Sequence, residues 1–502
     1  MGLLGTVVRI NQATSPPTMQ AANLTNVALF VNGSRGPQGV VVPVTSFEDY
    51  KMKFGTPAPG STIGLYSFYG VKGLFDNANP YPFTLYCVRP STSGGIAASL
   101  TVGTSGNTTT FTAAWQGNVS VGSGGNNIKI QIVQDGSNFD VNIYEYDPVS
   151  GNNYLKEQYI NVNNSTIVQT INVVNQSNYV MVSSAGTGGL QVIQQPTALS
   201  GGVDPAEPTE AQVAASLPLL NNYSVQFIGS LNVVCNGTSA GAWATDLLSY
   251  TNGRYTSLGI LAAPSSTNAN NVGQNFSNAL TGYMVFGAAY FNWYNVQDIY
   301  NNIQLIPPIG HIIGAYYIKK KNLDGYIAHS APAGVLSNIQ GITSLQYNLD
   351  LPTVESLVHN QYVNATMFVN GYGYIVRTSR SLSNSDLYYS ISRLTSLMYI
   401  IESVQNTMIV FEQTPNSPET RSKAKSTIDS FLLDQYTKGM FNKDGGVSQA
   451  YLVVCDTTNN TALIQANRWL MVDITLKFAE VIEAIVISLK PVAIGYNISI
   501  SS

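Results

Sequence analysis

The chain has 502 residues and a formal net charge of −4, and only 10% of its residues are charged, against about 25% in ordinary soluble domains. Its length exceeds a single ordinary hydrophobic core and predicts three or four modules. The sequence has no basic block and no apolar run of roughly 18 residues, which argues against binding to duplex DNA or an anionic membrane and against a membrane-spanning helix.

Asn, Ser, Thr, Gly and Tyr take the place of the missing charged residues, while apolar residues still make up 44% of the chain. A free monomer with so few charges is poorly soluble, because mixed surface ions keep proteins apart. Either other subunits cover much of the surface, or the source proteome is rich in these polar residues. Cys87, Cys235 and Cys455 are far apart in apolar runs, so we expect buried free thiols in a reducing compartment.

The N-terminal segment 1–23 begins with a short β-type run, Leu3–Ile10, and continues into Asn11–Asn23, which contains Pro16 and Pro17. Few apolar anchors occur in the second part. We therefore expect an extended arm and linker that is detached from any core.

Segment 24–90 alternates strand and helix signals, and we expect it to form a small α/β part that packs on the main core. Ser46 is predicted to cap a helix that Gly55 ends. The predicted order is strand, helix, helix, strand. The expected elements are a strand at Val27–Val31, a further β-type run at Val40–Val44, helices at Phe47–Phe54 and Tyr66–Asn77, and a strand at Phe83–Arg89.

Between residues 91 and 200 the sequence changes to short strands separated by Gly, Asn and Ser clusters, as at Ile128–Gln134 and Val141–Tyr146. We expect an inserted all-β outer domain here. Segment 201–371 returns to alternating elements and predicts an α/β layer. Its expected elements are strands at Gln226–Val233 and Ser257–Ala262 and helices at Gly241–Tyr250 and Val272–Tyr283.

Segment 372–478 is assigned to a C-terminal α+β part with two amphipathic helices, around which the rest of the chain is organised. In the first helix, apolar residues recur at steps of three and four, which places them on one face. The second helix begins after Ser417, at Pro418, and ends before Gly439. The first apolar stripe consists of Leu387, Ile391, Leu394, Met398, Ile401, Val404 and Met408, and the second of Ala424, Ile428, Phe431, Leu432 and Tyr436.

Three strands are predicted to follow these helices, at Ala450–Cys455, Leu470–Leu476 and Val481–Leu489. Segment 479–502 is assigned as a C-terminal strand and arm. A basic helix face is either solvated or in contact with a partner. The outer face of the second helix is expected to carry Arg421, Lys423, Lys425 and Asp429.

No arrangement of catalytic or metal-binding residues stands out. The chain has no phosphate-binding loop, and its glycine runs lack the strand-to-helix context of a dinucleotide site. His311, His329 and His359 are well separated and form no His-x-x-x-His pair. A hydrolase triad of Asp204, His329 and Ser330 fails because no Gly-x-Ser-x-Gly nucleophile elbow occurs. We therefore expect no enzyme, no bound metal and no cofactor.

The basic cluster Lys319-Lys320-Lys321 follows an apolar run that is predicted to be a strand. We interpret the cluster either as a solvated turn or as a polar contact with another subunit. The following residues, Asn322–Gly325, favour the turn.

Several short motifs occur in the order in which contractile tail sheath proteins of bacteriophages and related injection machines carry them, and the sequence resembles that family over most of its length. No single motif is specific, but the ordered set is. The motifs are Gly33–Pro37 with Val42–Phe47 and Phe54-Gly55, Gly117–Ile132, Leu199–Asp204, Pro307–Gly314, Asp324–Tyr326 with Ala331–Ala333, Tyr374–Arg380, and Phe411-Glu412.

The resemblance implies a structural subunit whose hexameric rings stack helically around an inner tube and contract to drive the tube through a target cell envelope. It implies a subtilisin-like, non-catalytic α/β domain in the middle of an α+β multidomain chain with extended terminal arms. Expected partners are copies of the chain, the inner tail tube protein, and baseplate and tail terminator proteins, without nucleic acid or membrane insertion. The expected location is the virion tail, assembled in the host cytoplasm, or the cytoplasm for a cellular injection system.

Both ends of the chain are predicted to add strands to sheets of neighbouring copies, because a lone strand before a Pro-rich linker lacks local partners for its N–H and C=O groups. The sheet of the C-terminal part is the expected receiver. The C-terminal donor is Val481–Leu489 or Val492–Ile500, and the resemblance favours the first. The donor residues are Thr6, Val7, Val8, Arg9, Ile10, Ala484, Ile485, Val486, Ile487, Ser488 and Leu489.

A second hypothesis places basic side chains of the C-terminal part against an acidic inner tube, with Arg421, Lys423, Lys425 and Arg468 as candidates. Two other functions stay open, a self-assembling surface-layer protein and an α/β hydrolase. The sequence does not distinguish a phage from a cellular injection system.

Overall fold

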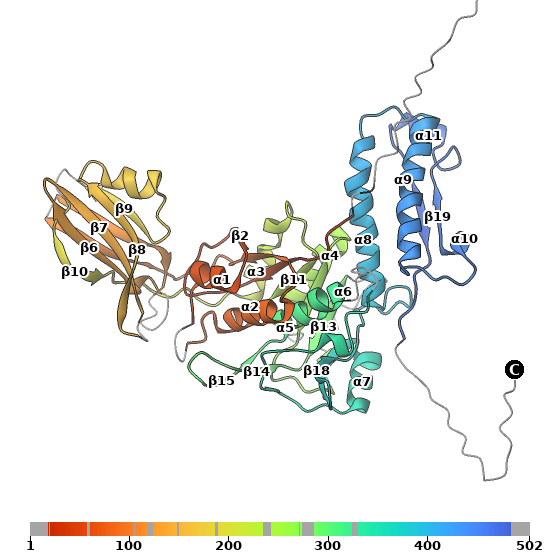
Figure 1. Cartoon of the computed structure of the whole chain (residues 1–502), viewed down its shortest axis with the longest axis horizontal. Helices are drawn as coiled ribbons and strands as arrows, with labels where there is room; N and C mark the ends of the chain where they lie inside the picture. Colours follow the sequence, from red (N-terminus) through yellow and green to blue (C-terminus); the bar gives the residue numbers. More distant parts are fainter. Residues whose placement is uncertain are drawn as a thin grey trace, which may run out of the picture.

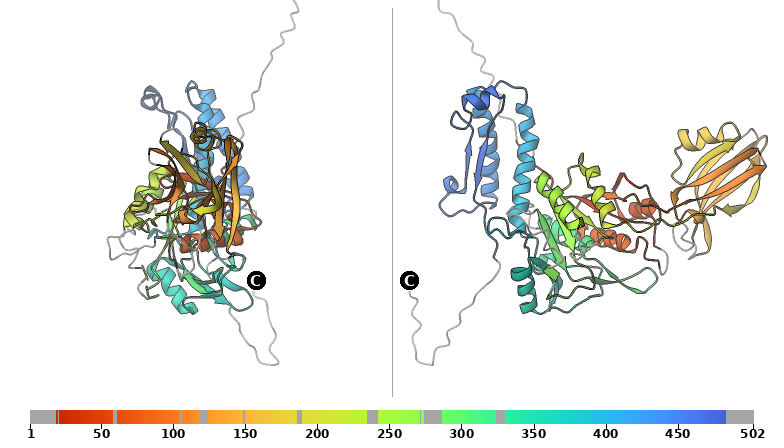
Figure 2. Two further views of the ribbon diagram at one scale, coloured as in Figure 1. Left: turned by 90° about the vertical axis from the view of Figure 1, so that its left-hand side faces the viewer. Right: turned by 180° about the vertical axis from the view of Figure 1, so that it is seen from behind.

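The computed structural model describes residues 19, 21–57, 61–104, 106–117, 124–147, 150–185, 189–233, 242–270, 272–273, 286–323 and 330–482. Three bodies lie in a row (Figure 1). A β-rich body stands at one end, a central α/β body in the middle, and a C-terminal unit of two long helices and a small sheet at the other end. The view from behind shows the same order (Figure 2).

An eight-stranded sheet forms the middle of the central body, in the order β18-β17-β13-β12-β11-β1-β3-β2. Its inner strands are parallel, while β2 and β18 pair antiparallel at the two edges. Strands β11, β12 and β13 are buried throughout, which is typical of parallel strands covered on both faces. The strands are β1 (Asn26–Phe30), β2 (Val41–Val44), β3 (Thr84–Val88), β11 (Phe227–Ser230), β12 (Leu258–Ala262), β13 (Gly287–Phe291), β17 (Val363–Val369) and β18 (Gly373–Val376).

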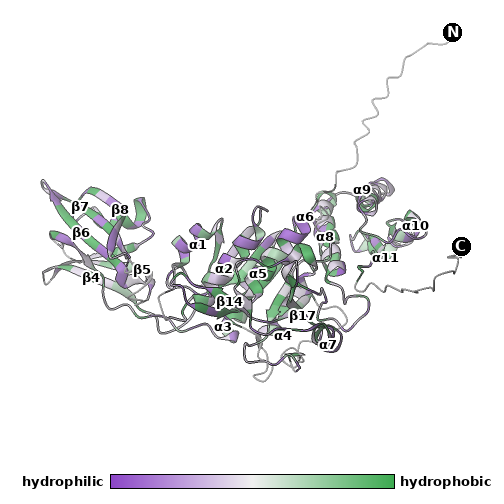
Figure 3. Ribbon diagram, turned by 60° about the horizontal axis from the view of Figure 1, so that its bottom comes forward, coloured by the Kyte–Doolittle hydropathy of each residue, from purple (hydrophilic) through white to green (hydrophobic). Residues whose placement is uncertain are grey.

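Helices cover both faces of this sheet and bury two separate cores, and hydrophobic residues concentrate on the central strands and on α5 (Figure 3). One core lies under α1, α2 and α5, and the other under α3, α4 and α7. A small three-stranded sheet flanks the first core. The elements are α1 (Phe47–Phe54), α2 (Leu65–Ala78), α3 (Glu210–Ala215), α4 (Ala242–Arg254), α5 (Ile309–Ile312), α7 (Leu351–Gln361), β14 (Tyr294–Gln297), β15 (Ile303–Ile306) and β16 (Ser344–Leu345).

The strands and helices predicted for segment 24–90 are all present, with ends that differ by at most one residue. The Ser46 hydroxyl accepts the N–H of Asp49 (3.1 Å), and Gly55 ends α1 at a φ of 79°. These predictions are confirmed because caps are local signals. Strands β11 and β12 and helix α4 also agree with the prediction. The predicted helix Val272–Tyr283 lies outside the described residues, except for its first two positions.

The prediction of an apolar strand and a turn before and at the lysine cluster is wrong. Helix α5 continues as a π-helical stretch, Ile313–Lys319, and as α6 (Lys320–Leu323). Lys321 has 0% of its surface exposed, so it is not a solvated residue. A short apolar run fits a buried helix as well as a strand, so periodicity could not separate the two.

Lys321 is an amine in an aromatic environment. Its Nζ lies 5.0 Å from the ring centre of Phe227 and 5.7 Å from that of Tyr317, and it has no hydrogen-bond partner among the described residues. Burial lowers the pKa of Lys321 to about 7. The side chain therefore loses its proton far more readily in the folded chain than in the unfolded chain.

Helix α2 and the segment beginning with α5 pack backbone against backbone at glycines. A Cβ atom on Gly310 would lie 1.9 Å from the carbonyl oxygen of Gly70, and one on Gly73 would lie 2.2 Å from the ring of His311. That ring is buried, and burial lowers the pKa of His311 to about 3, so it packs as a neutral group. This contact therefore requires residues without side chains.

The β-rich body consists of two sheets, β10-β6-β7-β8 and β4-β5-β9, with one hydrophobic core between them. It also contains a π-helical stretch at Gln169–Val174. The strands are β4 (Ala97–Thr104), β5 (Asn107–Gln116), β6 (Ile128–Asp135), β7 (Asn138–Asp147), β8 (Asn152–Val162), β9 (Val180–Ala185) and β10 (Ile193–Ala198).

Two kinds of contact join the β-rich body to the central body. The outgoing and returning chains pair with each other, through bridges of Ile96 with Val203 and of Ser99 with Ser200. Arg35, 5% exposed, forms an ion pair with Glu145 of β7 (2.6 Å). Its guanidinium also donates to the carbonyl of Lys51 (2.8 Å). The two terminal nitrogens of the guanidinium therefore have both a counter-ion and a hydrogen bond, which a buried charge requires, while its Nε is buried without a partner among the described residues.

The C-terminal unit has its own core, and its second helix begins and ends as predicted. The Ser417 hydroxyl accepts the N–H of Thr420 (3.2 Å), and Gly439 has a φ of 91°. The first helix begins only at Ile391, so Leu387, 65% exposed, does not belong to its stripe. The elements are α8 (Ile391–Met408), α9 (Pro418–Thr437), α10 (Val447–Ala450), β19 (Tyr451–Val454), α11 (Ala462–Ala466) and β20 (Asp473–Leu476).

The predicted third strand, Val481–Leu489, lies outside the described residues after its second position. Across the described ranges, no helix combines the length and the apolar character that crossing a lipid bilayer requires.

We predict that Gly310→Ala destabilises the protein by about 1–3 kcal/mol or more, because the added methyl group meets a backbone carbonyl that cannot yield. Thermal unfolding measures the loss as a lower Tm. Gly253→Ala in α4 is the matched control, because a Cβ atom there meets nothing within 4 Å. The control should gain about 0.5–1 kcal/mol from its helix preference. Equal Tm values for the two variants would contradict this account.

We predict that Lys321→Met removes a pH dependence of stability. The folded-state pKa of about 7 lies below the ordinary value of 10.5, so the unfolded chain binds more protons between these values and stability rises with pH. Between pH 7.5 and 9 the parent should gain about 2 kcal/mol from this residue, at 1.36 kcal/mol per unit of pKa difference. Parallel Tm measurements on parent, Lys321→Met and Lys320→Met show whether only the Lys321 variant loses that gain.

Candidate intersubunit site

The C-terminal unit presents a two-stranded antiparallel sheet, β19 with β20, that is open at its sides. The Tyr451 hydroxyl donates to the Asp429 carbonyl of α9 (3.2 Å), while Leu452, the next residue, is 57% exposed. Apart from a bridge between Phe441 and Phe478, neither strand continues into a further ladder in the described ranges. The backbone N–H and C=O groups of these edges can therefore accept an incoming strand.

The described part of the N-terminal segment lies on this unit. Leu24 is completely buried in the core of the C-terminal unit, and Met19 packs against the same core. The N–H of Ala22 donates to the hydroxyl of Ser403 (3.0 Å). The expectation of an arm detached from any core is therefore wrong for residues 21–23, because Met19 on one side and Leu24 on the other pack in the core of the C-terminal unit.

Helix α8 belongs to two cores. Its first half contributes Ile391, Leu394 and Met398 to a core of the central sheet, and Ile400 belongs to the core beneath α9. The predicted single apolar face therefore needs correction, because polar side chains occupy buried positions along the helix. These are Ser392, Thr395, Ser396, Glu402, Ser403 and Thr407.

Glu402 fixes the helix to the start of the central strands. The residue is 8% exposed, and its carboxylate accepts hydrogen bonds from the Ser224 hydroxyl and from the Gln226 amide (3.0 and 3.2 Å). The Gln226 side chain in turn accepts the N–H of Asn26 (3.0 Å). A buried carboxylate requires such donors, so these contacts define one orientation of α8.

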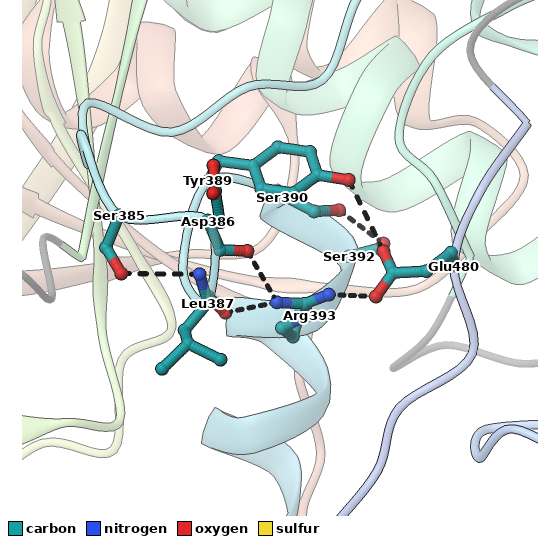
Figure 4. A network of polar contacts seen from close by, with 8 residues as sticks. All are labelled: Ser385, Asp386, Leu387, Tyr389, Ser390, Ser392, Arg393 and Glu480. Atoms are coloured by element: carbon teal, nitrogen blue, oxygen red, sulfur yellow. Dashed lines mark hydrogen bonds and ion pairs between the residues drawn. The ribbon is translucent and has the colours of Figure 1, made fainter.

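A second polar network holds the chain just before its last described residue (Figure 4). The carboxylate of Glu480 forms an ion pair with Arg393 of α8 and accepts the Tyr389 hydroxyl (3.4 Å). Arg393 also donates to the carbonyls of Asp386 (2.8 Å) and Leu387 (2.6 Å). This network, which we call the exit latch, holds Glu480, which follows β20, beside the N-terminal end of α8.

The predicted strand donors are not among the positions that the structure describes. Thr6, Val7, Val8, Arg9 and Ile10 precede the described residues, and Ala484, Ile485, Val486, Ile487, Ser488 and Leu489 follow them.

The predicted basic face contains an error at Arg421. Arg421 is 5% exposed and donates to the carbonyl and side-chain oxygens of Asn416 (3.1 and 2.8 Å), so it faces the chain itself. Lys423 and Arg468 are exposed, and Lys425 is half-buried. The sequence spacing places Arg421 near the lysines. It does not show that the guanidinium turns back to donate hydrogen bonds to Asn416, in the turn before α9.

Two features of the site were missed by sequence reasoning. The exit latch joins Tyr389 and Arg393 to a residue about 90 positions later, and only the spacing of the first two, one helical turn, gives a local signal. Exposed apolar side chains also lie on α11, just after it, and on the α8–α9 connection, and α11 and this connection are at the same end of the unit (Figure 1). They are Ile409, Val410, Leu463 and Trp469.

The described residues provide no geometric support for the α/β hydrolase alternative. His329 of the imagined triad lies outside them. Within them, no three His, Cys, Asp or Glu side chains come together in a way that could hold a metal ion. Cys87 and Cys455 are buried free thiols, as expected, while Cys235 lies outside the described ranges.

The chain shares the fold of tail sheath proteins of phage type and of contractile injection systems. The sheath tail protein of Listeria innocua is 16% identical, with a TM-score of 0.59 over 88% of this chain and 90% of that one. That of Desulfitobacterium hafniense is 14% identical, with a TM-score of 0.60 over 90% and 93%. The contracted helical sheath of the anti-feeding prophage is 12% identical, with a TM-score of 0.58 over 98% and 99%. No family model and no curated protein matches the sequence.

We predict that Glu480→Gln opens the exit latch without changing global stability by more than about 1 kcal/mol, because Glu480 is half exposed and such ion pairs contribute little. Amide hydrogen exchange should become faster in peptides covering 476–482. Asp434→Asn, which breaks the exposed Lys438–Asp434 pair of the same unit, is the control and should leave these peptides unchanged. Unaltered exchange in the Glu480 variant would show that the latch does not hold the chain.

Proposed function

We propose that the chain is the structural subunit of a contractile tail sheath, which polymerises as stacked hexameric rings around an inner tube and contracts to drive the tube through a target cell envelope. The observation that carries this proposal is the fold shared with sheath proteins over nearly the whole length of both chains. The shortage of charged surface residues agrees with a chain whose surface is largely covered by copies of itself.

We propose that neighbouring copies are joined by strand exchange at the open sheet of the C-terminal unit. The runs Leu3–Ile10 and Val481–Leu489 would each pair with β19 or β20 of another copy. Roughly four to six ladder hydrogen bonds at about 0.5–1.5 kcal/mol each give several kcal/mol per strand. Two observations support this arrangement: the sheet has free edges in its described part, and both flanking segments leave from this same unit.

The inner tube would contact the C-terminal unit through its exposed side chains. Lys423, Lys425 and Arg468 remain as basic candidates, whereas Arg421 does not, because it is buried. The exposed apolar residues at the α11 end offer a second kind of contact. Baseplate and tail terminator proteins would bind the two ends of the polymer.

The central body would act as a scaffold without catalytic function. We propose that its sheet corresponds to a subtilisin-like domain at 201–371, to which 24–90 contributes the strands β1, β2 and β3, with the β-rich outer domain at 91–200 and the C-terminal domain at 372–478. The separate cores of the β-rich body and of the C-terminal unit support these last two domains, while β18 and the first half of α8 pack in the central body. The sheath would belong either to a virion tail, where contraction serves genome ejection, or to a cellular injection system.

Electron microscopy of the purified full chain tests the proposal. Long hollow tubes of uniform width support a sheath, flat lattices would favour a surface-layer protein, and compact monomers that stay single at high concentration would contradict both.

The strand-exchange step is tested separately with Val7→Pro combined with Ile10→Pro, which removes two backbone donors from the first run. The matched control, Val7→Ile with Ile10→Val, keeps every donor. We expect the Pro variant to lose long tubes and the control to keep them. Tubes of normal length in the Pro variant would disprove strand exchange by this run while leaving the sheath itself supported.

A further inference from the structure

The central sheet has a point at which its crossover connections diverge. The connection from β1 to β3 carries α2 on one face of the sheet, and the connection from β11 to β12 carries α4 on the other. Because β1 and β11 are parallel neighbours whose connections lie on opposite faces, their carboxyl ends form the switch point of the sheet, and we call the region just beyond these ends the crevice. In open α/β sheets, this crevice is where ligands bind.

Glu207 fills this crevice with its carboxylate. The carboxylate accepts hydrogen bonds from the Asn32 amide (2.9 Å), which follows β1, and from the Asn232 amide (3.1 Å), which follows β11. The backbone N–H of Gly64, the N-cap residue of α2, also favours the ionised form of this carboxylate and acts to lower its pKa. Two amide donors and the positive end of a 14-residue helix therefore converge on one anionic group.

Arg89 adds a full positive charge to the crevice. It is 2% exposed, and it donates to the side-chain oxygen of Asn32 (3.3 Å) and to the carbonyl of Gly36 (2.8 Å). Its second terminal nitrogen, Nη2, is buried without a hydrogen-bond partner. Burial lowers the pKa of Arg89 to about 10, so the group still carries its charge at neutral pH. A buried cation requires an anion nearby.

Glu207 reaches the crevice from outside. Its residue surface is exposed as a whole, but its carboxylate contacts the buried Asn32 and the half-buried Asn232, and desolvation of the carboxylate raises its pKa. The residue belongs to the segment that returns from the β-rich body, four positions after Val203, which bridges to Ile96. The carboxylate thus ties the returning chain to the central sheet.

We propose that the carboxyl ends of β1 and β11 form an oxyanion-binding site for carboxylate groups, and that Glu207 occupies this site from within the chain and thereby fixes the direction of the β-rich body. The site would accept a small free carboxylate when Glu207 is shortened. This inference is independent of the proposed function, because it concerns a contact within one chain.

The test removes the internal ligand and supplies an external one. Glu207→Ala should lower Tm by about 1 °C, which corresponds to about 1 kcal/mol at an unfolding entropy of about 2.1 cal/mol/K per residue over 502 residues. Sodium acetate should restore part of this loss, while sodium chloride at equal ionic strength should not. Glu207→Gln should also lose stability but should not respond to acetate, because its side chain still blocks the site.

The direction of the β-rich body is measured in the same full-length variants. Spin labels on Ser137→Cys in the β6–β7 turn and on Ser356→Cys in α7, in a Cys235→Ser background, report the distance between the two bodies. We expect one narrow distance distribution in the parent, a broad one in Glu207→Ala, and narrowing again with acetate. Glu48→Gln, which breaks an exposed ion pair on α1, should keep the parent distribution.

Two results would overturn the proposal. One is a Glu207→Ala variant with the Tm and the distance distribution of the parent, which would show that the carboxylate holds nothing. The other is an equal rise of Tm with acetate in the parent and in the variant, which would show a general solvent effect in place of a site.

Discussion

Helix α8 is the element on which the arrangement of the central body and the C-terminal unit depends, because two cores bury it in succession. Leu394 and Met398 are completely buried against the central sheet, and Ile400 is 2% exposed against α9. Burying each such side chain contributes about 1.5–3 kcal/mol, so the two bodies cannot turn apart without a large loss. The hydrogen bonds of Glu402 add direction to this packing, since a carboxylate at this depth must keep its donors.

The sequence predicts local structure well here and long-range structure poorly. Helix α1, from its Ser46 cap to Gly55, depends on residues within one or two turns, so its limits can be read from the chain. Lys321 looks like a surface residue by type, and only the packing of Phe227 and Tyr317 around it shows otherwise. The residue type alone does not indicate that this lysine is buried.

The candidate intersubunit site shows the same difference between local features, which the sequence predicts, and long-range contacts, which it does not. The spacing of α9 predicts its buried stripe, but the position of Arg421 depends on the turn formed by Asn416. The partners of Glu480 lie about 90 residues earlier in the chain. No periodicity or motif connects residues at such a separation, because their contact depends on how complete elements pack.

Uncharged amide side chains, which partly replace charged residues in this chain, also form hydrogen bonds inside the protein. Asn364 is completely buried and donates to the carbonyls of Ala289 (3.2 Å) and Arg380 (2.6 Å). Asn292, also buried, exchanges two hydrogen bonds with the backbone of Tyr347. Neutral amides thus satisfy backbone groups within and just beyond the strands of the central sheet. Part of the high Asn content therefore serves the fold itself.

The paired chains that lead to the β-rich body have a mechanical consequence. Ser93 accepts the N–H of Ala206 (3.3 Å), and the bridges at Ile96 and Ser99 continue this pairing outward. A force that draws the β-rich body away from the central body along these paired segments is carried by two covalent backbones. It therefore places no load on the hydrogen bonds between them. The force then reaches the central sheet at two separate places, the end of β3 and the segment before α3, so drag on the outer body is spread across the sheet and no single strand bears it alone.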